Sequence, residues 1–191
     1  MTFDPIAYSY LLGIYLGDGC ISAQRNNGWR LRIVLDAIYP EIIEECAMAM
    51  YAIHPTRVNV MVRKGKRCVE VGNSWKHWPC VFPQHGAGRK HLRPIMLTEW
   101  QDEIVWPHVQ ALLRGLIHSD GTRIIATERK GSYVRRAPRY AFSNRSEDIL
   151  GIFTKGCDLA GVHWTRASKK QVAIYSKAAV ARLDEFIGPK S

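Results

Sequence analysis

The sequence predicts an α+β fold that contains two copies of one unit, each with the order helix, hairpin, helix, hairpin, helix. Two observations support this prediction. An apolar run that ends in Asp-Gly occurs twice, at residues 10–19 and 112–121. In addition, four pairs of matching residues are each separated by 102 positions: Pro5 and Pro107, Gly13 and Gly115, Asp18 and Asp120, Ser74 and Ser176. Chance rarely keeps four such pairs in register, so we expect an internal repeat.

Composition fits a globular protein. The chain has 191 residues, 47% of them hydrophobic, which is enough for a packed core without disulfides. No apolar run reaches the roughly 18 residues that a membrane span needs, and residues 1–5 lack the basic start of a signal peptide. The five cysteines form no C-x-x-C pair. They are expected to be reduced, which favours the cytoplasm, or an organelle matrix if the gene is organellar.

Charge indicates the kind of partner. Lysine and arginine number 27 against 17 acidic residues, which gives a net charge of +10, and the pI is near 9.6. Such an excess predicts a polyanionic partner, and nucleic acid is the commonest one. Charge by itself leaves acidic proteins and membrane surfaces open.

In the first copy, each helix is expected to begin at a residue that favours a helix start. Asp4 and Pro5 form a cap and a first helical residue, Pro40 opens the second helix, and Ser74 is predicted to cap the third. Alternating polar and apolar residues predict the strands. The expected elements are a helix over 5–17, a hairpin with strands at 20–24 and 29–36, a helix over 40–53, a second hairpin around the turn 64–66, and a helix over 75–81. The side chains expected to point inward are Leu31, Ile33 and Leu35 in the first hairpin and Val58, Val60 and Val62 in the second.

The second copy repeats this order after a connector. Residues 83–94, rich in Gly, His and Arg, are predicted to be an exposed linker, so the two repeats are assigned to residues 1–95 and 96–191. Thr98 and Gln101 form a capping box for a short helix that reaches Trp106. The remaining elements are expected to be a helix over 107–119, strands at 122–128 and 139–143 around a basic loop at 129–136, a helix from Ser146 to 160, strands at 162–166 and 171–175, and a last helix capped by Ser176.

The repeated apolar runs carry the candidate site. Small residues at i and i+4 allow two helices to approach closely, and an aspartate follows each pair directly. If the helices meet along these faces, Asp18 and Asp120 lie side by side and offer the hard oxygen ligands that a divalent metal prefers. The carbonyls of Gly17 and Ser119, at the helix ends, are candidates for the same coordination shell. The residues predicted to form the helix contact are Gly13, Gly17, Gly115 and Ser119. One Asp-Gly would more often be a turn signal, but two in register favour a site.

Residues 11–19, LLGIYLGDG, and 113–121, LRGLIHSDG, resemble the two signature helices of the LAGLIDADG homing endonucleases in their single-chain, two-repeat form. The resemblance covers essentially the whole chain. It departs from the family pattern at Arg114, where a small residue is usual, and at Leu16 and His118, which replace an acidic residue. The resemblance implies two αββαββα repeats, with the signature helices packed at the interface and two antiparallel sheets that form a DNA-binding saddle.

The same resemblance implies a site-specific double-stranded DNA endonuclease that acts as a monomer. Asp18 and Asp120 would hold Mg²⁺, with Mn²⁺ as a substitute and Ca²⁺ as an ion that binds without supporting cleavage. Both strands would be cut across the minor groove, which leaves short 3′ overhangs. Family members place a basic residue near the scissile phosphates, and Lys90 is the best match for it in the first repeat, with Lys190 at a comparable point after the last helix.

The sheet faces opposite the core are predicted to contact DNA, since basic and polar side chains alternate there with apolar ones. Arginine and glutamine read base edges, whereas basic residues in turns contact phosphates. The predicted base-facing residues are Arg30, Arg32, Arg57, Asn59 and Arg63 in the first repeat, and Arg123, Thr127, Arg139, Ser143, Gln171 and Tyr175 in the second. The predicted phosphate contacts are Lys64, Lys66, Arg135, Arg136, Lys169 and Lys170.

Two other functions stay open at this point. One is a DNA-binding regulator that keeps the fold without cleavage, and the other is an RNA-splicing maturase, which the resemblance also allows. The presence of both aspartates favours the endonuclease.

Overall fold

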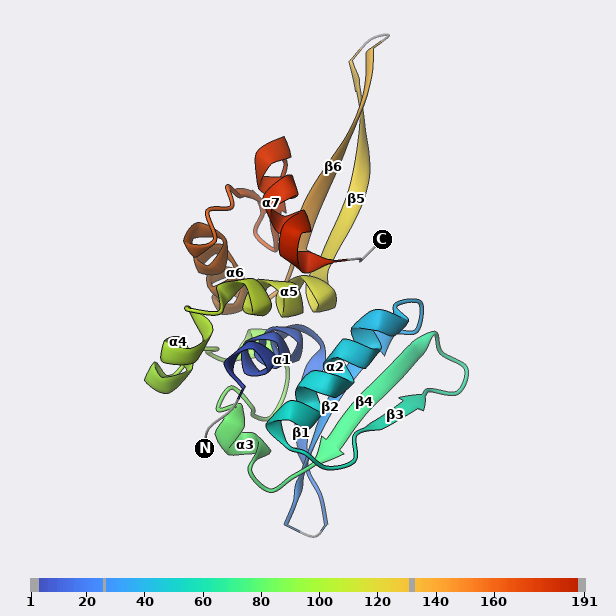
Figure 1. Ribbon diagram of the computed structural model, residues 1–191, viewed down its shortest axis with the longest axis vertical. Coiled ribbons are helices and arrows are strands. Elements are labelled where there is room, and N and C mark those ends of the chain that lie inside the picture. The colour runs from blue at the N-terminus through green and yellow to red at the C-terminus, as the bar shows by residue number, and fades with distance from the viewer. Residues whose placement is uncertain (1–3, 26, 131–132, 189–191) are drawn as a thin grey trace.

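The computed structural model describes residues 4–25, 27–130 and 133–188. Its two halves each contain a four-stranded antiparallel sheet with helices on one face, and helices α1 and α5 lie side by side between the halves (Figure 1). This confirms the predicted fold class. The first half contains α1 (Pro5–Asp18), β1 (Gly19–Ala23), β2 (Trp29–Asp36), α2 (Pro40–Ile53), β3 (Asn59–Val62), β4 (Cys68–Ser74) and α3 (Trp78–Val81). The 3₁₀ turn η1 (Lys90–Leu92) and α4 (Glu99–Val105) lead to the second half, which contains α5 (Val109–Asp120), β5 (Gly121–Lys130), β6 (Tyr133–Ser143), α6 (Glu147–Leu159), β7 (Thr165–Ser168), β8 (Gln171–Ile174) and α7 (Lys177–Ile187).

The two sheets have the same strand order, β1-β2-β4-β3 and β5-β6-β8-β7. Their registers also correspond. In the first sheet one row across the strands contains Cys20, Arg32, Gly72 and Asn59, and in the second sheet one row contains Thr122, Ala141, Ala173 and Thr165. Because Cys20 and Thr122 are 102 positions apart, the sheets are equivalent row by row and the internal repeat is structural.

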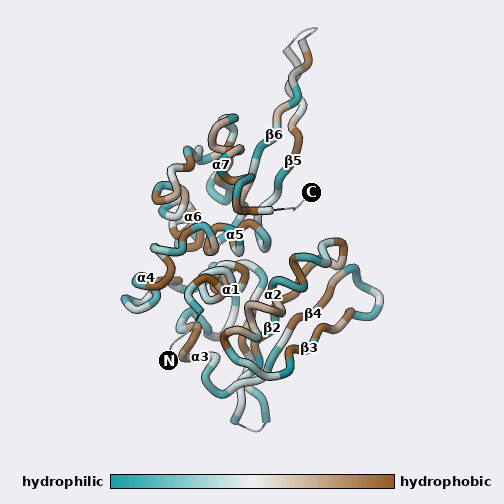
Figure 2. Tube along the Cα trace, in the orientation of Figure 1, coloured by the Kyte–Doolittle hydropathy of each residue, from teal (hydrophilic) through white to brown (hydrophobic). Residues whose placement is uncertain are grey.

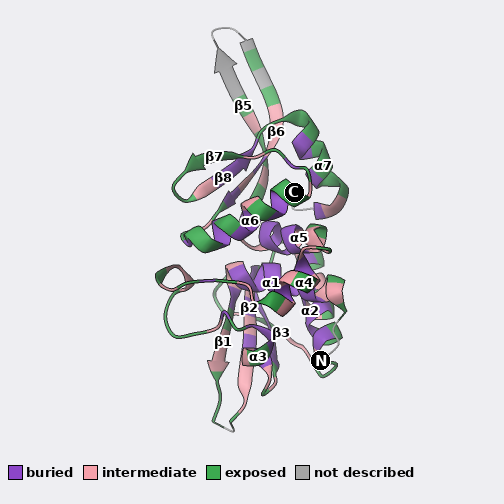
Figure 3. Ribbon diagram, turned by 90° about the vertical axis from the view of Figure 1, so that its left-hand side faces the viewer, coloured by how far each residue is buried: buried purple, intermediate pink, exposed green. Residues whose placement is uncertain are grey.

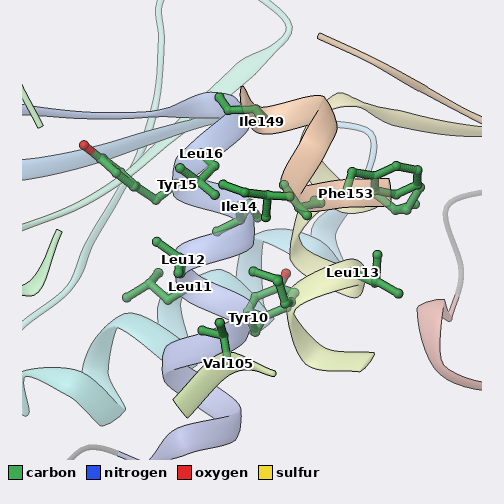
Figure 4. Close-up of a cluster of buried hydrophobic side chains, with 14 of the residues drawn as sticks. Tyr10, Leu11, Leu12, Ile14, Tyr15, Leu16, Val105, Leu113, Ile149 and Phe153 are labelled. Carbon is green, nitrogen blue, oxygen red and sulfur yellow. The ribbon is translucent and has the colours of Figure 1, made fainter. Parts of the chain in front are cut away.

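Helix α1 lies at the centre of the core. All its residues from 8 to 16 are buried, which explains a sequence that is apolar on nearly every side. Figure 3 shows α1 and α5 as buried segments between the two sheets. Figure 4 shows Tyr10 and Ile14 of α1 in one cluster of buried side chains with Leu113 and Phe153 of the second half. One continuous core therefore joins both halves.

Most of the predicted helix starts are confirmed. The Asp4 carboxylate accepts hydrogen bonds from the backbone N–H groups of Ile6 and Ala7, at 2.9 and 3.0 Å. Ser146 and Ser176 cap α6 and α7 in the same way. These caps satisfy N–H groups that have no partner inside the helix. Among the described residues, no helix is long and apolar enough to cross a membrane.

Two predicted helix starts are wrong. Ser74 is the last residue of β4, where it pairs with Arg30, so α3 begins only at Trp78. Pairing in the sheet therefore takes precedence over a local cap signal. Helix α5 begins at Val109, two residues after Pro107.

The predicted exposed linker, residues 83–94, is partly buried. Gln84 is buried, and its Nε2 donates to Gln101 Oε1 at 2.6 Å and to the Met96 carbonyl at 2.7 Å. Lys90 and Leu92 bound the 3₁₀ turn η1. The connector is therefore held against the body of the protein. The boundary between residues 95 and 96 stays a prediction.

The basic loop predicted at residues 129–136 is mostly strand. Strands β5 and β6 continue their pairing through Thr127 and Arg136 to Lys130 and Tyr133. The resulting two-stranded arm projects from the second half (Figure 1), so no core faces it and its sequence lacks apolar alternation. Strand β7 also begins later than predicted, at Thr165.

Strand β3 shows a further difference. Register places Val60 opposite Val71 and Val62 opposite Val69, on the core side as predicted. Their burial was predicted wrongly, because Val60 is 52% and Val62 is 75% exposed. Strand β3 is the outer strand of its sheet, and its apolar residues appear in brown at that edge in Figure 2.

Candidate metal centre and nucleic-acid interface

The contact between α1 and α5 is made by backbone atoms. A Cβ added at Gly13 would overlap the carbonyl of Leu112 and lie 2.8 Å from the Leu116 nitrogen. A Cβ added at Gly115 would overlap the carbonyl of Tyr10 and lie 2.8 Å from the Ile14 nitrogen. Both positions therefore require glycine for this helix spacing.

The same contact brings the helix ends together. A Cβ at Gly17 would lie 2.5 Å from the Cβ of Ser119 and 3.0 Å from Asp120 Oδ2. The carboxylate of Asp120 thus lies against Gly17, the residue that precedes Asp18. Both aspartates line one cleft of about 610 Å³.

Asn144 supports the carboxylate of Asp120. Its Nδ2 donates to Asp120 Oδ2 at 2.6 Å, and its Oδ1 accepts the backbone N–H of Ser146 at 2.7 Å. The amide is thereby fixed between the start of α6 and the cleft. Sequence reasoning missed Asn144, because an Asn two residues before a cap signals only a local turn.

Lys90 reaches the same cleft from the connector. Its Nζ donates to the carbonyls of Tyr15 and Leu16, the latter at 3.0 Å, and lies 3.4 Å from the carbonyl of Gly17. These carbonyls end α1 and carry partial negative charge. Burial lowers the pKa of Lys90 to about 8, although Asp120 and Asp18 oppose this shift. The structure therefore brings Lys90 close to both aspartates.

The remaining cleft wall is strongly basic. Arg93 holds the connector in shape, since its guanidinium donates to the carbonyls of Gln84 at 2.8 Å and Gly88 at 3.1 Å. Lys170, a predicted phosphate contact, lines the cleft. Sequence reasoning missed three other basic lining residues, Arg89, His91 and Arg145, because each lies outside the predicted strands and helices.

The donor set fits magnesium. The described residues contain no group of three or more His, Cys, Asp or Glu side chains that could enclose a metal. The cleft is lined by Asp18, Asp120 and Gly17, whereas Ser119, the other predicted carbonyl ligand, lines a neighbouring hollow that also contacts Asp18. Magnesium uses one or two carboxylates together with water and substrate phosphates, so an open pair of aspartates suits it.

The departures from the family pattern have structural roles. The Arg114 guanidinium binds both carboxylate oxygens of Glu45, at 2.6 and 2.7 Å, and donates to the carbonyls of Phe186 and Ile187. His118 is buried and lies 3.1 Å from the Tyr10 hydroxyl. These side chains join α5 to α2 and to the end of α7.

In the first sheet, the predicted base-facing strand residues share one face. Arg32 and Asn59 lie in one row, and Arg30 and Arg63 reach Glu70 at 3.3 and 2.6 Å on that face. Burial opposes ionisation of Glu70, but bonds from both arginines hold its pKa below the ordinary value. Outside the strands, Arg57 precedes β3 and both Lys64 and Lys66 lie in the exposed turn before β4.

In the second sheet, Arg139, Ser143 and Gln171 lie on the outward face. The prediction for Arg123 is wrong. It pairs with Tyr140, which is buried, and its guanidinium binds Asp184 of α7 through two bonds of 2.8 Å.

Thr127 pairs with Arg136 across the two strands, and alternation along β5 places it on the same side as Arg123. Thr127 is exposed and lies in the projecting arm of β5 and β6, so its contact with DNA stays a prediction. The exposed residues Tyr175, Lys169 and Lys170 flank β8. The side chain of Arg135 and all of Lys190 lie outside the described residues.

Replacing Asp184 should give a pH-dependent loss of stability. Hydrogen bonds from Arg123 hold the pKa of Asp184 below its ordinary value. A carboxyl with a lowered folded-state pKa stabilises the fold above its unfolded pKa, and this contribution is lost as the pH falls through the folded pKa. Asp184→Asn is expected to lower the free energy of unfolding by about 0.5–1 kcal/mol at pH 7, the size of a solvent-screened pair. Urea titrations should show this difference shrinking below about pH 4. A difference that is constant with pH would contradict the assignment.

Comparison with known proteins supports the fold. No protein-family model and no curated protein matches the sequence. Among solved structures, the chain is similar to I-DmoI in complex with DNA and Mn, with 16% identity, a TM-score of 0.60 and coverage of 98% of this chain and 99% of that one.

Two WhiA structures are also similar. The N-terminal LAGLIDADG domain of DUF199/WhiA matches with 14% identity, a TM-score of 0.55 and coverage of 98% and 83%. Full-length DUF199/WhiA from Thermatoga maritima matches with 15% identity and a TM-score of 0.62, and this chain spans 58% of its length. With two equivalent antiparallel sheets joined through a glycine-mediated helix pair, the chain has the LAGLIDADG fold.

Proposed function

We propose that this chain is a site-specific endonuclease that cuts double-stranded DNA with a divalent metal ion. One observation carries the proposal: Asp18 and Asp120 come from equivalent positions of the two repeats and line one cleft. The net charge of +10 and the basic cleft wall support a DNA substrate. The similarity to I-DmoI, described in complex with DNA and Mn and with DNA and Ca, supports a divalent metal.

Different residues of the chain would bind the metal ion and contact the scissile phosphate. Asp18 and Asp120 would hold Mg²⁺, and Asn144 fixes the orientation of the Asp120 carboxylate. A bound Mg²⁺ would lower the pKa of a coordinated water and neutralise charge on the scissile phosphate. The Lys90 ammonium, held at the end of α1, would add positive charge beside that phosphate.

The pseudo-twofold arrangement suits two antiparallel DNA strands. Each repeat contributes one aspartate and one sheet, so a single chain acting as a monomer would address both strands. We propose that the outward sheet faces lie in the major groove and that cleavage crosses the minor groove, which leaves short 3′ overhangs.

A selected duplex tests this function. The full chain is used to select bound duplexes from a random library in Ca²⁺, and the recovered site is then incubated with Mg²⁺, Mn²⁺ or Ca²⁺. We expect a double-strand break with Mg²⁺ and Mn²⁺ and none with Ca²⁺. Tight binding with no break in any of the three ions would contradict the endonuclease.

A DNA-binding regulator without cleavage is the second candidate. The LAGLIDADG domain of DUF199/WhiA is similar to this chain at nearly the same TM-score as I-DmoI, so the fold is compatible with either function. The cleavage assay separates them, because only the regulator would bind a selected duplex and leave it intact. Selection of structured RNA over duplex DNA would instead favour a maturase.

Replacing Lys90 should slow cleavage. Lys90→Met keeps the side-chain length and removes the charge near the phosphate, so we expect a rate decrease of about 10²-fold with duplex affinity little changed. Arg89→Met is the matched control, because Arg89 lines the same cleft, is exposed and makes no contact with the α1 carbonyls that bind Lys90. Single-turnover rates measure both. A Lys90→Met protein that cuts at the wild-type rate would exclude a role for Lys90 in the reaction.

A further inference from the structure

The equivalence of the two sheets identifies Glu70 and Gln171 as counterparts. Glu70 lies opposite Val34, two residues along the strands from the pair Arg32 and Gly72 and on the same face. Gln171 lies opposite Ser143, two residues along from the equivalent pair in the second sheet. The same position on the two proposed DNA faces therefore holds a carboxylate in one half and an amide in the other.

In the first half, Glu70 organises two arginines. Arg63 reaches Glu70 Oε2 at 2.6 Å and Arg30 reaches Oε1 at 3.3 Å. On β4, Gly72 lies between Glu70 and Ser74, the residue that pairs with Arg30. A Cβ at Gly72 would be 3.1 Å from Arg30 Nη2, so glycine leaves room for this guanidinium. Glu70 is only 7% exposed, whereas the Arg63 side chain is 39% exposed. The carboxylate is thus covered by guanidinium groups whose other N–H donors stay available.

This arrangement suits guanine. A guanidinium fork matches the O6 and N7 acceptors of guanine in the major groove, and the match depends on a fixed orientation. Glu70 on β4 holds Arg30 of β2 and Arg63, which directly follows β3, so both guanidinium groups are oriented before DNA binds.

In the second half, neutral side chains occupy most of the equivalent positions. Gln171 Nε2 donates to Ser143 Oγ at 2.9 Å, so the position of Glu70 holds a neutral amide. The next row contains Thr122, Ala141, Ala173 and Thr165, where the first sheet has Arg32 and Asn59. Amides pair with adenine, and methyl groups contact the methyl of thymine. Arg139, the counterpart of Arg30, retains its charge in the second sheet, and Lys169 is basic at the position equivalent to Cys68, which lies beside Arg63.

We propose that the two halves read DNA of different composition: guanine-rich positions lie under the first repeat and A·T-rich positions under the second. Glu70 is the positioning residue for the guanine-reading arginines Arg30 and Arg63. The inference rests on the proposed DNA-binding function and specifies its substrate.

Selection with matched variants tests it. Wild-type chain, Glu70→Gln and Gln171→Glu are each used to select duplexes from the same random library, and base preference is measured at every position. The wild-type site should contain one G·C-rich half and one A·T-rich half. Glu70→Gln should reduce a guanine preference of about 10- to 100-fold to a few-fold at one or two positions of the G·C-rich half only. Gln171→Glu should change only the other half, and equal thermal midpoints would show that both variants fold.

Two results would overturn the inference. One is a wild-type site whose halves have the same composition, and the other is a Glu70→Gln protein that selects the wild-type site unchanged. Failure of the proposed function has a different result. A site that is selected but never cut in Mg²⁺ contradicts the proposed endonuclease. The base preferences at that site still decide whether the two halves read DNA of different composition. A selection that recovers no common site contradicts both proposals.

Discussion

Asp18→Asn and Asp120→Asn proteins are each expected to bind the selected duplex with nearly normal affinity and to cut it about 10³-fold more slowly. Each substitution replaces an anionic metal ligand with a neutral amide of the same shape. Loss of the metal's contribution raises the activation barrier by several kcal/mol, which gives this factor. Because both carboxylates line one cleft, either substitution should slow cutting of both strands. The measurement is single-turnover cleavage with each strand labelled separately.

Asp158→Asn is the matched control for these variants. Asp158 lies in α6, where it accepts a bond from Trp164 at 2.7 Å and has no place in the cleft lining. It should cut at the wild-type rate. If Asp18→Asn and Asp120→Asn also cut both strands at that rate in Mg²⁺, the paired aspartates have no part in the reaction.

The second large effect is expected at Gly115. Gly115→Leu places a branched side chain where even a Cβ overlaps the carbonyl of Tyr10, so α1 and α5 must move apart. Overpacking of this kind costs about 3 kcal/mol, and the two carboxylates at the helix ends separate with it. We expect a lower thermal midpoint and loss of cleavage, with DNA binding retained where the sheets stay folded.

Two further glycine variants keep this prediction testable. Gly115→Ala adds only the overlapping Cβ and should show the same effects in weaker form. Gly151→Leu, in the exposed part of α6, meets no atom within 4 Å of an added Cβ. It should be neutral or stabilising by up to about 1 kcal/mol, because glycine disfavours helix. A Gly115→Leu protein with wild-type stability and cleavage would refute the packing model.

The repeat and the paired aspartates could be predicted from the sequence because their signals are local. Helix caps, the Asp-Gly ends of α1 and α5, and the small residues before them depend on neighbouring residues in the chain. The offset of 102 positions then places the two helices in equivalent roles. No long-range information is needed for these features.

Features that depend on distant partners were missed or misplaced. Arg123 is a basic strand residue of the kind expected on the DNA face, but strand register places it beside the buried Tyr140, where Asp184 of α7 binds its guanidinium. Val60 and Val62 have core-type side chains on a strand that turns out to be the sheet edge. The role of Glu70 could not be predicted from the sequence, because Arg30 and Arg63 become its neighbours only through strand register.

The central claim is that Asp18 and Asp120 bind metal in one cleft between the repeats. Electron paramagnetic resonance titration of Mn²⁺ into the protein–DNA complex tests it without relying on cleavage. The wild-type complex is expected to bind Mn²⁺ tightly, and Asp18→Asn and Asp120→Asn should each weaken that binding by at least about 10-fold, whereas Asp158→Asn should not. Wild-type Mn²⁺ binding in both aspartate variants would contradict the claim.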